Sequence, residues 1–355
     1  TIVRQCELRN DDDRLREMWP VMLRGMEHLR RMRDDSFKLG KDYPAYGLFQ
    51  PSFGDGGIYG PEPEYTTPMN VILGLSDAYR AGKRLKLPRY EEFGVFAQEL
   101  MARMRECIER DRRTTPEGIP YVPLSMAENE SYKPQTGCAT IARVAFHGEF
   151  EPDDRIVTDL LRLIDACDDR EGIPECTGWR SDQSIYTYSS VRFAQLLLQA
   201  GQREKAADYL YAFANHASAS RVWREEQPVR ETHSAEICGD MPHNWASVEF
   251  IRLVRNLVVL ETFTGVELLP GLPEEWLPRA GDSLVLEKTP TRFGKLSLEL
   301  SVRGKGGYLL LPGRTATSSL NTWDCTGLEK LFLTAESWRN PMGNTCFPWR
   351  KSRSA

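Results

Sequence analysis

The sequence predicts a mainly α-helical protein that ends in a small β domain. Three observations indicate this fold class. Up to about residue 265, apolar residues recur at the three- and four-residue spacing of amphipathic helices. The joins between these segments alternate between tight turns and long loops. After residues 269–273, short apolar and β-branched runs broken by glycine and proline replace the helical pattern, which is typical of strands. We therefore expect a helical domain over residues 1–268 and a β domain over residues 269–355.

Eight helical segments are expected along the first domain. The first follows Asp11, Asp12 and Asp13, whose charges suit the positive end of a helix. Within residues 153–170, Ile156, Leu160 and Leu163 fall on one face. Gly201 separates two helices as a C-terminal cap. The expected helices span residues 14–33, 65–85, 89–111, 138–146, 153–170, 183–200, 204–218 and 243–262.

Four connections are long and rich in glycine, proline and aromatic residues. They are residues 34–64, 112–136, 171–182 and 219–242. Long loops inside compact domains often carry function. Because tight turns alternate with them, successive long loops fall at the same end of the helical hairpins. We expect such hairpins to build a ring whose cavity opens toward the long loops.

In the C-terminal part, the pattern predicts strands at residues 283–286, 296–302 and 308–311. Residues 289–294, with the sequence Thr-Pro-Thr-Arg-Phe-Gly, are expected to form a turn between the first two. From about Cys325 onward the sequence shows no recognisable pattern. We expect a poorly ordered or atypical end.

Composition excludes several classes of protein. With 355 residues, 41% of them hydrophobic and 10% aromatic, the chain can bury a substantial core. A net charge of -5 and a pI near 5.7 argue against nucleic acid or an anionic membrane as partner. No apolar run approaches the roughly 18 residues that span a bilayer. No charged-then-apolar leader follows Thr1, which slightly favours a cytoplasmic location.

The eight cysteines and five histidines show no metal-site pattern. No Cys-x-x-Cys is present, and the histidines do not cluster. We expect reduced, mostly buried cysteines in a reducing compartment, and neither a metal nor a cofactor. The aspartate pairs at 11–13, 153–154 and 168–169 lie at helix ends, so we interpret them as caps.

Two acidic loops, each leading into an apolar helix, indicate a site that cuts sugars. One contains Glu225 and Glu226 and continues through residues 239–247; the other spans residues 54–67. Both are rich in aromatic residues and glycine. Glycoside hydrolysis needs two carboxyl groups, one to protonate the leaving oxygen and one to activate water or attack.

This arrangement resembles the (α/α)6 toroid of the six-hairpin glycosidases, which include glucoamylases, trehalases, family 63 glucosidases and family 78 α-L-rhamnosidases. Residues 223–227 with 239–247 are similar to the loop that precedes the last toroid helix, where these families place the catalytic base. Residues 55–67 are similar to the loop before the sixth helix, where glucoamylases place the acid. The β segment with its turn at 289–294 is similar to the β-sandwich that follows the toroid in rhamnosidase-like enzymes.

The resemblance also implies a number of helices. Seven expected helices follow the acid loop, as in the family layout, but one precedes it where the layout has five. Four helices of the ring are therefore expected outside this sequence. An upstream segment or a second chain would supply them.

The resemblance implies Glu226 as general base, because it precedes Gln227 as the glucoamylase base precedes a glutamine. Glu225 is the rival, since rhamnosidases place the base nearer the tryptophan, here Trp223. For the general acid Glu64 leads, followed by Glu62 and Asp55. A general acid needs a raised pKa, which partial burial or a neighbouring carboxylate provides. The alternative for Glu64 is a helix-start carboxylate whose pKa the helix dipole lowers.

Further residues are expected to bind the sugar, whose C–H face packs well on aromatic rings. Each aromatic residue can equally be core packing. Asp55 also fits a plain turn, and His243 also fits the start of the last helix. The predicted substrate-binding residues are Asp55, Glu62, Trp179, Trp223, His243 and Trp245, with Tyr186 as a further stacking candidate.

The resemblance thus implies an exo-acting, inverting glycoside hydrolase with a carbohydrate substrate. One alternative is a polysaccharide lyase on a similar toroid, with a tyrosine or histidine base and a basic cleft. Arg180, Arg221, Arg224 and His147 keep that alternative open. The other alternative is a non-catalytic carbohydrate-binding scaffold.

Overall fold

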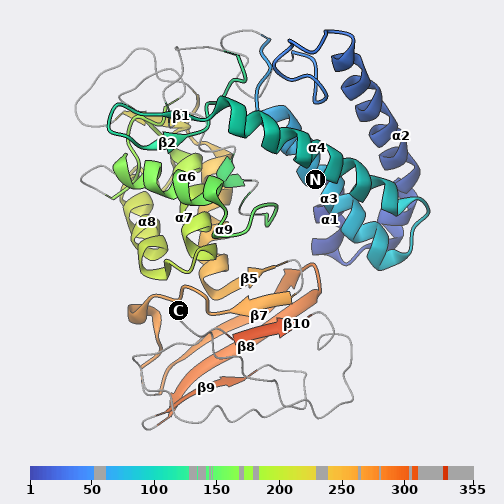
Figure 1. Ribbon diagram of the computed structural model, residues 1–355. Helices are drawn as coiled ribbons and strands as arrows, with labels where there is room; N and C mark the ends of the chain where they lie inside the picture. The colour runs from blue at the N-terminus through green and yellow to red at the C-terminus, as the bar shows by residue number, and fades with distance from the viewer. Residues whose placement is uncertain are drawn as a thin grey trace. The chain divides into compact units, whose positions relative to one another are not determined.

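The chain divides into two compact units, a helical unit and a β unit. The helical unit holds Thr1–Val3 and Asp12–Val254; the β unit holds Arg4–Asp11 and Arg255–Ala355. The division falls within the last helix, earlier in the chain than the predicted boundary at 268/269. The computed structural model (Figure 1) describes residues 1–51, 61–127, 134, 141–143, 145, 147–167, 172–178, 184–228, 239–262, 265–279, 281–303, 306–310 and 331–334. The mainly α-helical fold class predicted from the sequence is confirmed.

Two helices, not the single one predicted, precede the loop that carries Glu64. The first, α1 (Ile2–Arg9), escaped the sequence analysis because it is only eight residues long. Val3 and Cys6 on α1 are nevertheless buried. The second, α2 (Asp12–Phe37), begins at the predicted aspartate run. Asp12 receives two hydrogen bonds from the guanidinium of Arg84, at 2.9 and 2.7 Å.

Helices α3 (Thr66–Leu85) and α4 (Tyr90–Asp111) form an antiparallel hairpin (Figure 1). Gly82 on α3 permits their close approach, because a Cβ at this position would lie 2.5 Å from the Cβ of Tyr90. The same Cβ would lie 2.7 Å from the ring of Trp19 on α2. The Trp19 indole N–H donates to the Pro88 carbonyl at 2.9 Å, in the turn between the two helices. The sequence therefore folds α2, α3 and α4 into one packed group.

A small hairpin and a short helix follow. Strands β1 (Arg113–Thr114) and β2 (Pro120–Tyr121) pair antiparallel. Helix α6 (Arg155–Ala166) begins at Asp154, whose carboxylate accepts a hydrogen bond from the backbone N–H of Ile156 at 3.0 Å, so the predicted cap is confirmed. Arg105 on α4 also bonds Asp154, at 2.8 Å. Of the helix predicted at 138–146, the described residues 141–143 and 145 are helical.

Helices α7 (Thr187–Gln199) and α8 (Arg203–Asn215) form a second antiparallel hairpin, joined at Gly201 as predicted. Gly201 has φ +78°, a conformation that suits glycine. The helix predicted from residue 183 begins only at Thr187, because β3 (Ser184–Tyr186) precedes it and pairs with β4 (Glu226–Pro228). Helix α7 is buried on nearly all sides.

No helix within the described ranges is long and apolar enough to cross a membrane.

Helix α9 (Asn244–Val258) ends four residues earlier than predicted. The chain continues directly into strand β5 (Val259–Glu261). The β-branched pair Val258 and Val259 marks this change, because such side chains favour strands over helices. Strand β5 pairs with β6 (Gly265–Leu268), and β6 pairs with β10 (Leu331–Thr334). The C-terminal region thus contributes a strand that the sequence analysis missed; the rest of that region lies outside the described residues.

A second antiparallel sheet has the strand order β7 (Ser283–Thr291), β8 (Gly294–Arg303), β9 (Gly306–Leu310). Its strands contain the predicted segments 283–286 and 296–302 and residues 308–310 of the third; residue 311 lies outside the described residues. The predicted turn at 289–294 is shorter than expected, since Thr289, Pro290 and Thr291 belong to β7 and pair with β8. The 3-10 helix η2 (Glu274–Trp276) lies between the two sheets in the sequence.

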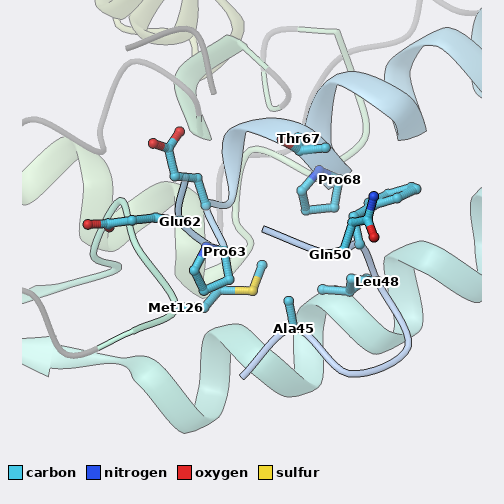
Figure 2. A pocket seen from close by; sticks show the side chains of 10 residues that line it. Ala45, Leu48, Gln50, Glu62, Pro63, Thr67, Pro68 and Met126 are labelled. Atoms are coloured by element: carbon cyan, nitrogen blue, oxygen red, sulfur yellow. The ribbon is translucent and has the colours of Figure 1, made fainter. Parts of the chain in front are cut away.

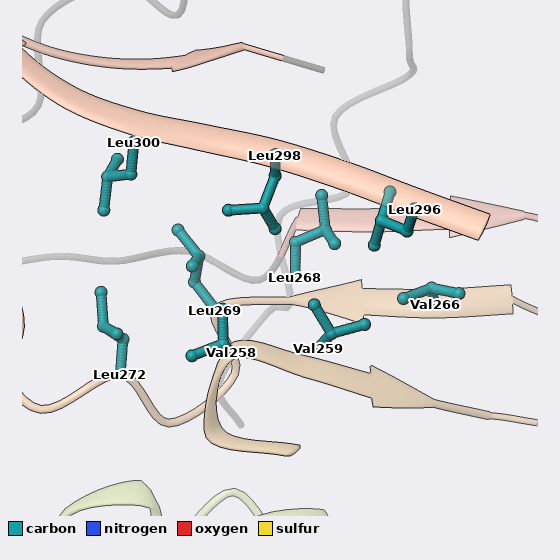
Figure 3. Close-up of a cluster of buried hydrophobic side chains, with 9 residues drawn as sticks. All are labelled: Val258, Val259, Val266, Leu268, Leu269, Leu272, Leu296, Leu298 and Leu300. Atoms are coloured by element: carbon teal, nitrogen blue, oxygen red, sulfur yellow. The ribbon is translucent and has the colours of Figure 1, made fainter. Parts of the chain in front are cut away.

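Both sheets contribute to one hydrophobic cluster (Figure 3). Leu296, Leu298 and Leu300 of β8 point in one direction, as alternate residues of a strand do. They face Val266 and Leu268 of β6. The end of α9, strand β5 and the segment after β6 complete the cluster with Val258, Val259, Leu269 and Leu272. This shared core explains why the last residues of α9 belong to the β unit.

Candidate functional site

The β3–β4 ribbon holds Glu226 in a defined place. Tyr186 of β3 lies directly opposite Glu226 of β4 in the register. Two residues back along β3, on the same face of the ribbon, the Ser184 hydroxyl donates to Oε2 of Glu226 at 3.4 Å. Glu226 and Ser184 are both 0% exposed. A two-stranded ribbon therefore fixes the position of the predicted base.

Glu225 directly precedes β4 and has other neighbours. Its backbone carbonyl accepts from the Thr187 N–H at 3.0 Å, and its own N–H donates to the Asp240 carbonyl at 3.1 Å. Its carboxylate lies against Gly239 and close to the side chains of Asp240 and His243. Glu225 and Glu226 thus have different neighbours.

An aromatic cluster lies beside Glu226. The rings of Tyr186 and Tyr188 have centroids 4.4 Å apart, and their hydroxyls are hydrogen bonded. His243 stacks on Tyr188 at 5.4 Å, and Trp245 meets Tyr188 edge-on at 5.3 Å. Trp245 is 50% exposed. The structure therefore brings three of the predicted residues, Tyr186, His243 and Trp245, into one cluster with an accessible indole.

Trp223 is a core residue, which corrects its prediction as a sugar platform. Its indole N–H donates to the Phe213 carbonyl at 2.8 Å. The ring stacks on Phe213 at 4.7 Å and also packs against Phe250 at 5.0 Å. With 5% of its surface exposed, the side chain cannot receive a sugar ring.

The segment that carries Glu64 pairs with the loop that follows β2. Glu64 and Ser125 form an antiparallel bridge. On either side, the Tyr65 N–H donates to the Leu124 carbonyl at 3.0 Å, and the Met126 N–H donates to the Pro63 carbonyl at 2.8 Å. Glu64 is 3% exposed and lies two residues before the first residue of α3. Two long loops that were predicted to share one end of the domain thus contact each other here.

A shallow surface recess adjoins Glu64 (Figure 2). Pro63 and Met126 face Leu48 and Ala45 across it, whereas the carboxylate of Glu62 points away from these apolar residues. The recess encloses no space of the size of a small molecule. On its own it therefore forms at most one wall of a sugar-binding site. Its lining is Ala45, Leu48, Phe49, Gln50, Glu62, Pro63, Glu64, Thr67, Pro68 and Met126.

Burial raises the pKa of Glu149, a residue that the sequence analysis did not select; a hydrogen bond with Ser76 and the charge of Arg80 oppose the rise. A raised pKa is the property a general acid needs. Ser76, however, lies ten residues after Thr66 on α3, which corresponds to about 15 Å along a helix. Glu149 is therefore remote from Glu64 and does not replace it as candidate acid.

One group in the described part of the chain has the geometry to hold a metal ion. Glu225, Asp240 and His243 offer ligand atoms within 4.8 Å of one another. Nδ1 of His243 lies 2.9 Å from Oδ1 of Asp240. This hydrogen bond lowers the pKa of the Asp240 carboxyl. It also explains the closeness of these two side chains without an ion, so we assign no metal to the group.

The remaining predicted residues divide into two sets. Asp55, Trp179 and Arg180 lie outside the described residues. His147 and Arg221 are described, with His147 half-buried at a helix end and Arg221 exposed with φ +58°. Sequence reasoning missed Ser184 and Tyr188. Residues 184–188, with the sequence Ser-Ile-Tyr-Thr-Tyr, carry the signal that could have found them. Ser184, Tyr186 and Tyr188 occupy alternate positions there, as residues on one face of a strand do.

Comparison with known proteins gives a fold likeness but no family. No family model and no curated protein matches the sequence. A solved sialidase structure aligns with a TM-score of 0.54 and 12% identity, over 85% of this chain and 30% of that one. A bacterial glucoamylase complexed with acarbose aligns with a TM-score of 0.42 and 15% identity, over 56% of this chain and 34% of that one. The chain spans about a third of the length of these two structures.

Proposed function

We propose that this chain carries the active site of a glycoside hydrolase that uses paired carboxyl groups, with Glu226 as general base and Glu64 as general acid. The observation that carries the proposal is the position of Glu226: a buried carboxylate on a short ribbon, directly opposite Tyr186 and next to a cluster that exposes Trp245. A carboxylate beside an accessible aromatic face can act on a sugar that stacks on that face. The fold likeness to a sialidase structure is consistent with this proposal.

Glu226 suits the base because the ribbon restricts its motion. A general base acts efficiently only when it is held within hydrogen-bond reach of the water it activates. Ser184 and Tyr186 flank it on the same face of the ribbon, and its backbone belongs to the β3–β4 ladder. Glu225 remains the rival, with its carboxylate turned toward Gly239 and the pair of Asp240 and His243.

Glu64 suits the acid because it is buried and held by backbone pairing with residues 124–126. Desolvation favours the neutral form of a carboxyl group, which is the form that donates a proton to the leaving oxygen. If the enzyme inverts, we expect the two carboxyl groups to stand about 6.5–9.5 Å apart, with room for a water. We further propose an exo-acting enzyme without metal or cofactor.

The helical unit is proposed to be part of an (α/α)6 toroid, and the β unit to be the sandwich that follows it. In support, α3–α4 and α7–α8 are antiparallel hairpins joined by tight turns. Helix α9 also exposes an apolar stripe of Trp245, Val248 and Ile251, of a kind that helices in a closed ring bury. We propose that an upstream segment or a second chain supplies the remaining helices.

The proposal is tested with the full-length protein on unactivated oligosaccharides and on a panel of 4-nitrophenyl α- and β-glycosides. On the oligosaccharides we expect Glu226→Gln and Glu64→Gln each to lower turnover about 10²–10⁴-fold, because the amide keeps the size of the side chain but cannot exchange a proton. The activated aryl leaving group needs little protonation, so it should rescue Glu64→Gln more than Glu226→Gln. Added azide should restore little activity to Glu226→Gln if the enzyme inverts, since no covalent intermediate is replaced.

Glu204→Gln on the exposed face of α8 is the matched control and should retain full activity. If Glu225→Gln is inactive while Glu226→Gln is active, the base is Glu225. If sugars bind but no glycoside is cleaved, the chain is a binding scaffold.

A polysaccharide lyase is the second candidate, and the cluster of Tyr186, Tyr188 and His243 with Arg192 nearby favours it. A lyase base is a tyrosine or histidine, and an arginine neutralises the uronate. Against this, Arg192 already pairs with Glu249 at 3.3 Å. An unsaturated, ultraviolet-absorbing product from a uronate polysaccharide would decide for the lyase.

A further inference from the structure

Tyr188 is the centre of the aromatic cluster, yet the proposed chemistry gives it no role. It is the second residue of α7 and is buried. Its ring or hydroxyl contacts Tyr186, His243, Trp245 and Arg192. These partners come from β3, from the start of α9 and from α7 itself.

A short path of contacts runs from the proposed base to the exposed indole through Tyr188. Glu226 lies opposite Tyr186 in the ribbon. The Tyr186 hydroxyl is hydrogen bonded to the Tyr188 hydroxyl. The Tyr188 ring then meets Trp245 edge-on, at 5.3 Å and an interplanar angle of 87°. One buried side chain therefore connects the strand that faces the base with the helix that presents the platform.

The orientation of Tyr188 is set from several directions. The Arg192 guanidinium lies over its ring at 4.7 Å, and Glu249 of α9 holds that guanidinium at 3.3 Å. His243 stacks on the ring with an interplanar angle of 19°. Cation–π and edge-to-face contacts depend on geometry, unlike plain apolar packing. An aliphatic residue of similar volume would fill the space without fixing the angle of Trp245.

We propose that Tyr188 is a positioning residue that holds the indole of Trp245 in the orientation on which a sugar's C–H face can stack. It thereby sets how tightly the Trp245 platform binds a sugar. The inference rests on the proposed glycoside hydrolase function. It assigns Tyr188 no contact with the substrate and no proton transfer.

The kinetic test replaces the ring. Tyr188→Leu, and Tyr188→Met as a second variant with a more adaptable side chain, should raise KM for the best aryl glycoside about 3- to 10-fold, the worth of an aromatic pair. The kcat should stay within about 2-fold, because the platform binds ground state and transition state alike. Tyr188→Phe keeps the ring and should restore KM to within about 2-fold of the wild type.

A double-mutant cycle separates positioning from general structure. If Tyr188 acts through Trp245, Tyr188→Leu should add no further rise of KM in a Trp245→Ala background. Tyr209→Leu, at a tyrosine of α8 that is also buried, is the matched control and should leave KM unchanged. Additive effects of the Tyr188 and Trp245 changes, or a loss of kcat with KM unchanged, would overturn the proposal.

A readout that needs no catalysis keeps this inference separate from the proposed function. Acrylamide quenching of tryptophan fluorescence is measured for each protein and for the same protein with Trp245→Phe. The difference between the two measurements gives the quenching of Trp245. Tyr188→Leu should increase this quenching, and Tyr188→Phe should not. If no glycoside is cleaved but quenching changes as expected, the proposed function fails and the positioning of Trp245 by Tyr188 stands; unchanged quenching contradicts the positioning itself.

Discussion

Two tryptophans near the proposed base, Trp223 and Trp245, have opposite environments. Trp223 lies between Phe213 and Phe250 and donates its indole N–H to a backbone carbonyl. Trp245 is half exposed and touches Tyr188 with an edge. A buried tryptophan contributes stability, and an exposed one beside a carboxylate is available to a ligand. Their burial therefore assigns Trp223 to folding and Trp245 to the proposed substrate platform.

We expect Trp223→Ala to reduce the free energy of unfolding by about 3–5 kcal/mol, because loss of a large buried ring leaves a cavity and removes the hydrogen bond to the Phe213 carbonyl. Trp245→Ala should reduce it by less than about 1 kcal/mol, since half of its surface is already in water. Urea unfolding followed by circular dichroism measures both, and each variant is the control for the other. Equal losses would show that Trp245 is a packing residue.

At the scale of elements, Glu261 ties together several parts of the β unit. Its carboxylate, at the end of β5, accepts two hydrogen bonds from Arg4 of α1, at 2.8 and 2.7 Å. It also pairs with Arg255 of α9, and the backbone N–H of Arg292 in the β7–β8 turn donates to it at 2.8 Å. Burial disfavours its charge, but the hydrogen bonds and charges of Arg4 and Arg255 outweigh burial and lower its pKa from 4.5 to about 2.

This pKa predicts a stability that depends on pH. A carboxyl whose pKa is lowered on folding stabilises the protein fully above its unfolded value near 4.5, and the contribution disappears as the pH falls toward about 2. The contribution should be roughly 3 kcal/mol at neutral pH. Glu261→Gln should therefore be less stable than the wild type at pH 7 and nearly equal to it near pH 2. Urea unfolding across this range measures the difference.

Glu287→Gln, at an exposed position of β7, is the control for this pH series. Its free energy of unfolding should equal that of the wild type at every pH. A difference between Glu261→Gln and the wild type that stays constant from pH 7 to 2 would contradict the assigned role of the Glu261 charge.

At the scale of the whole molecule, the two units do not follow a simple division of the chain. Residues 4–11, which include most of α1, belong to the β unit, although α2, the next helix in the chain, belongs to the helical unit. The Arg4–Glu261 pair accounts for this, since it joins positions separated by 257 residues. The N-terminal residues therefore stabilise a unit whose strands lie at the other end of the sequence.

Removal of residues 1–11 should weaken the β unit and leave the helical unit almost unaffected. Loss of the Arg4 hydrogen bonds to a charged carboxylate should cost about 1–3 kcal/mol, because Arg255 and Arg292 remain as partners. Hydrogen exchange followed by mass spectrometry should show faster exchange in β7 and β8 but not in α3 and α4. Arg14→Ala, at an exposed position of α2, is the control. If hydrogen exchange became equally faster in α3 and α4, the assignment of residues 4–11 to the β unit would be wrong.

Residue patterns alone predicted the mainly helical class, the caps at Asp154 and Gly201, and the three strands near residues 283–311. These are local features, set by periodicity and turn chemistry within a few residues. Two of the boundaries that were wrong, at the start of α7 and the end of α9, are places where a strand adjoins a helix. Pairing with β4 and β6 decides them, and both partners are distant in the sequence.

The candidate site shows the same division. The sequence by itself determined that two acidic loops exist and which residue types they carry. Only the tertiary structure decided that Trp223 is core, that Glu225 and Glu226 have different neighbours, and that buried Tyr188 connects Tyr186, opposite Glu226, to Trp245. Burial and side-chain orientation depend on which distant segments pack together, and a residue's type and spacing do not specify that packing.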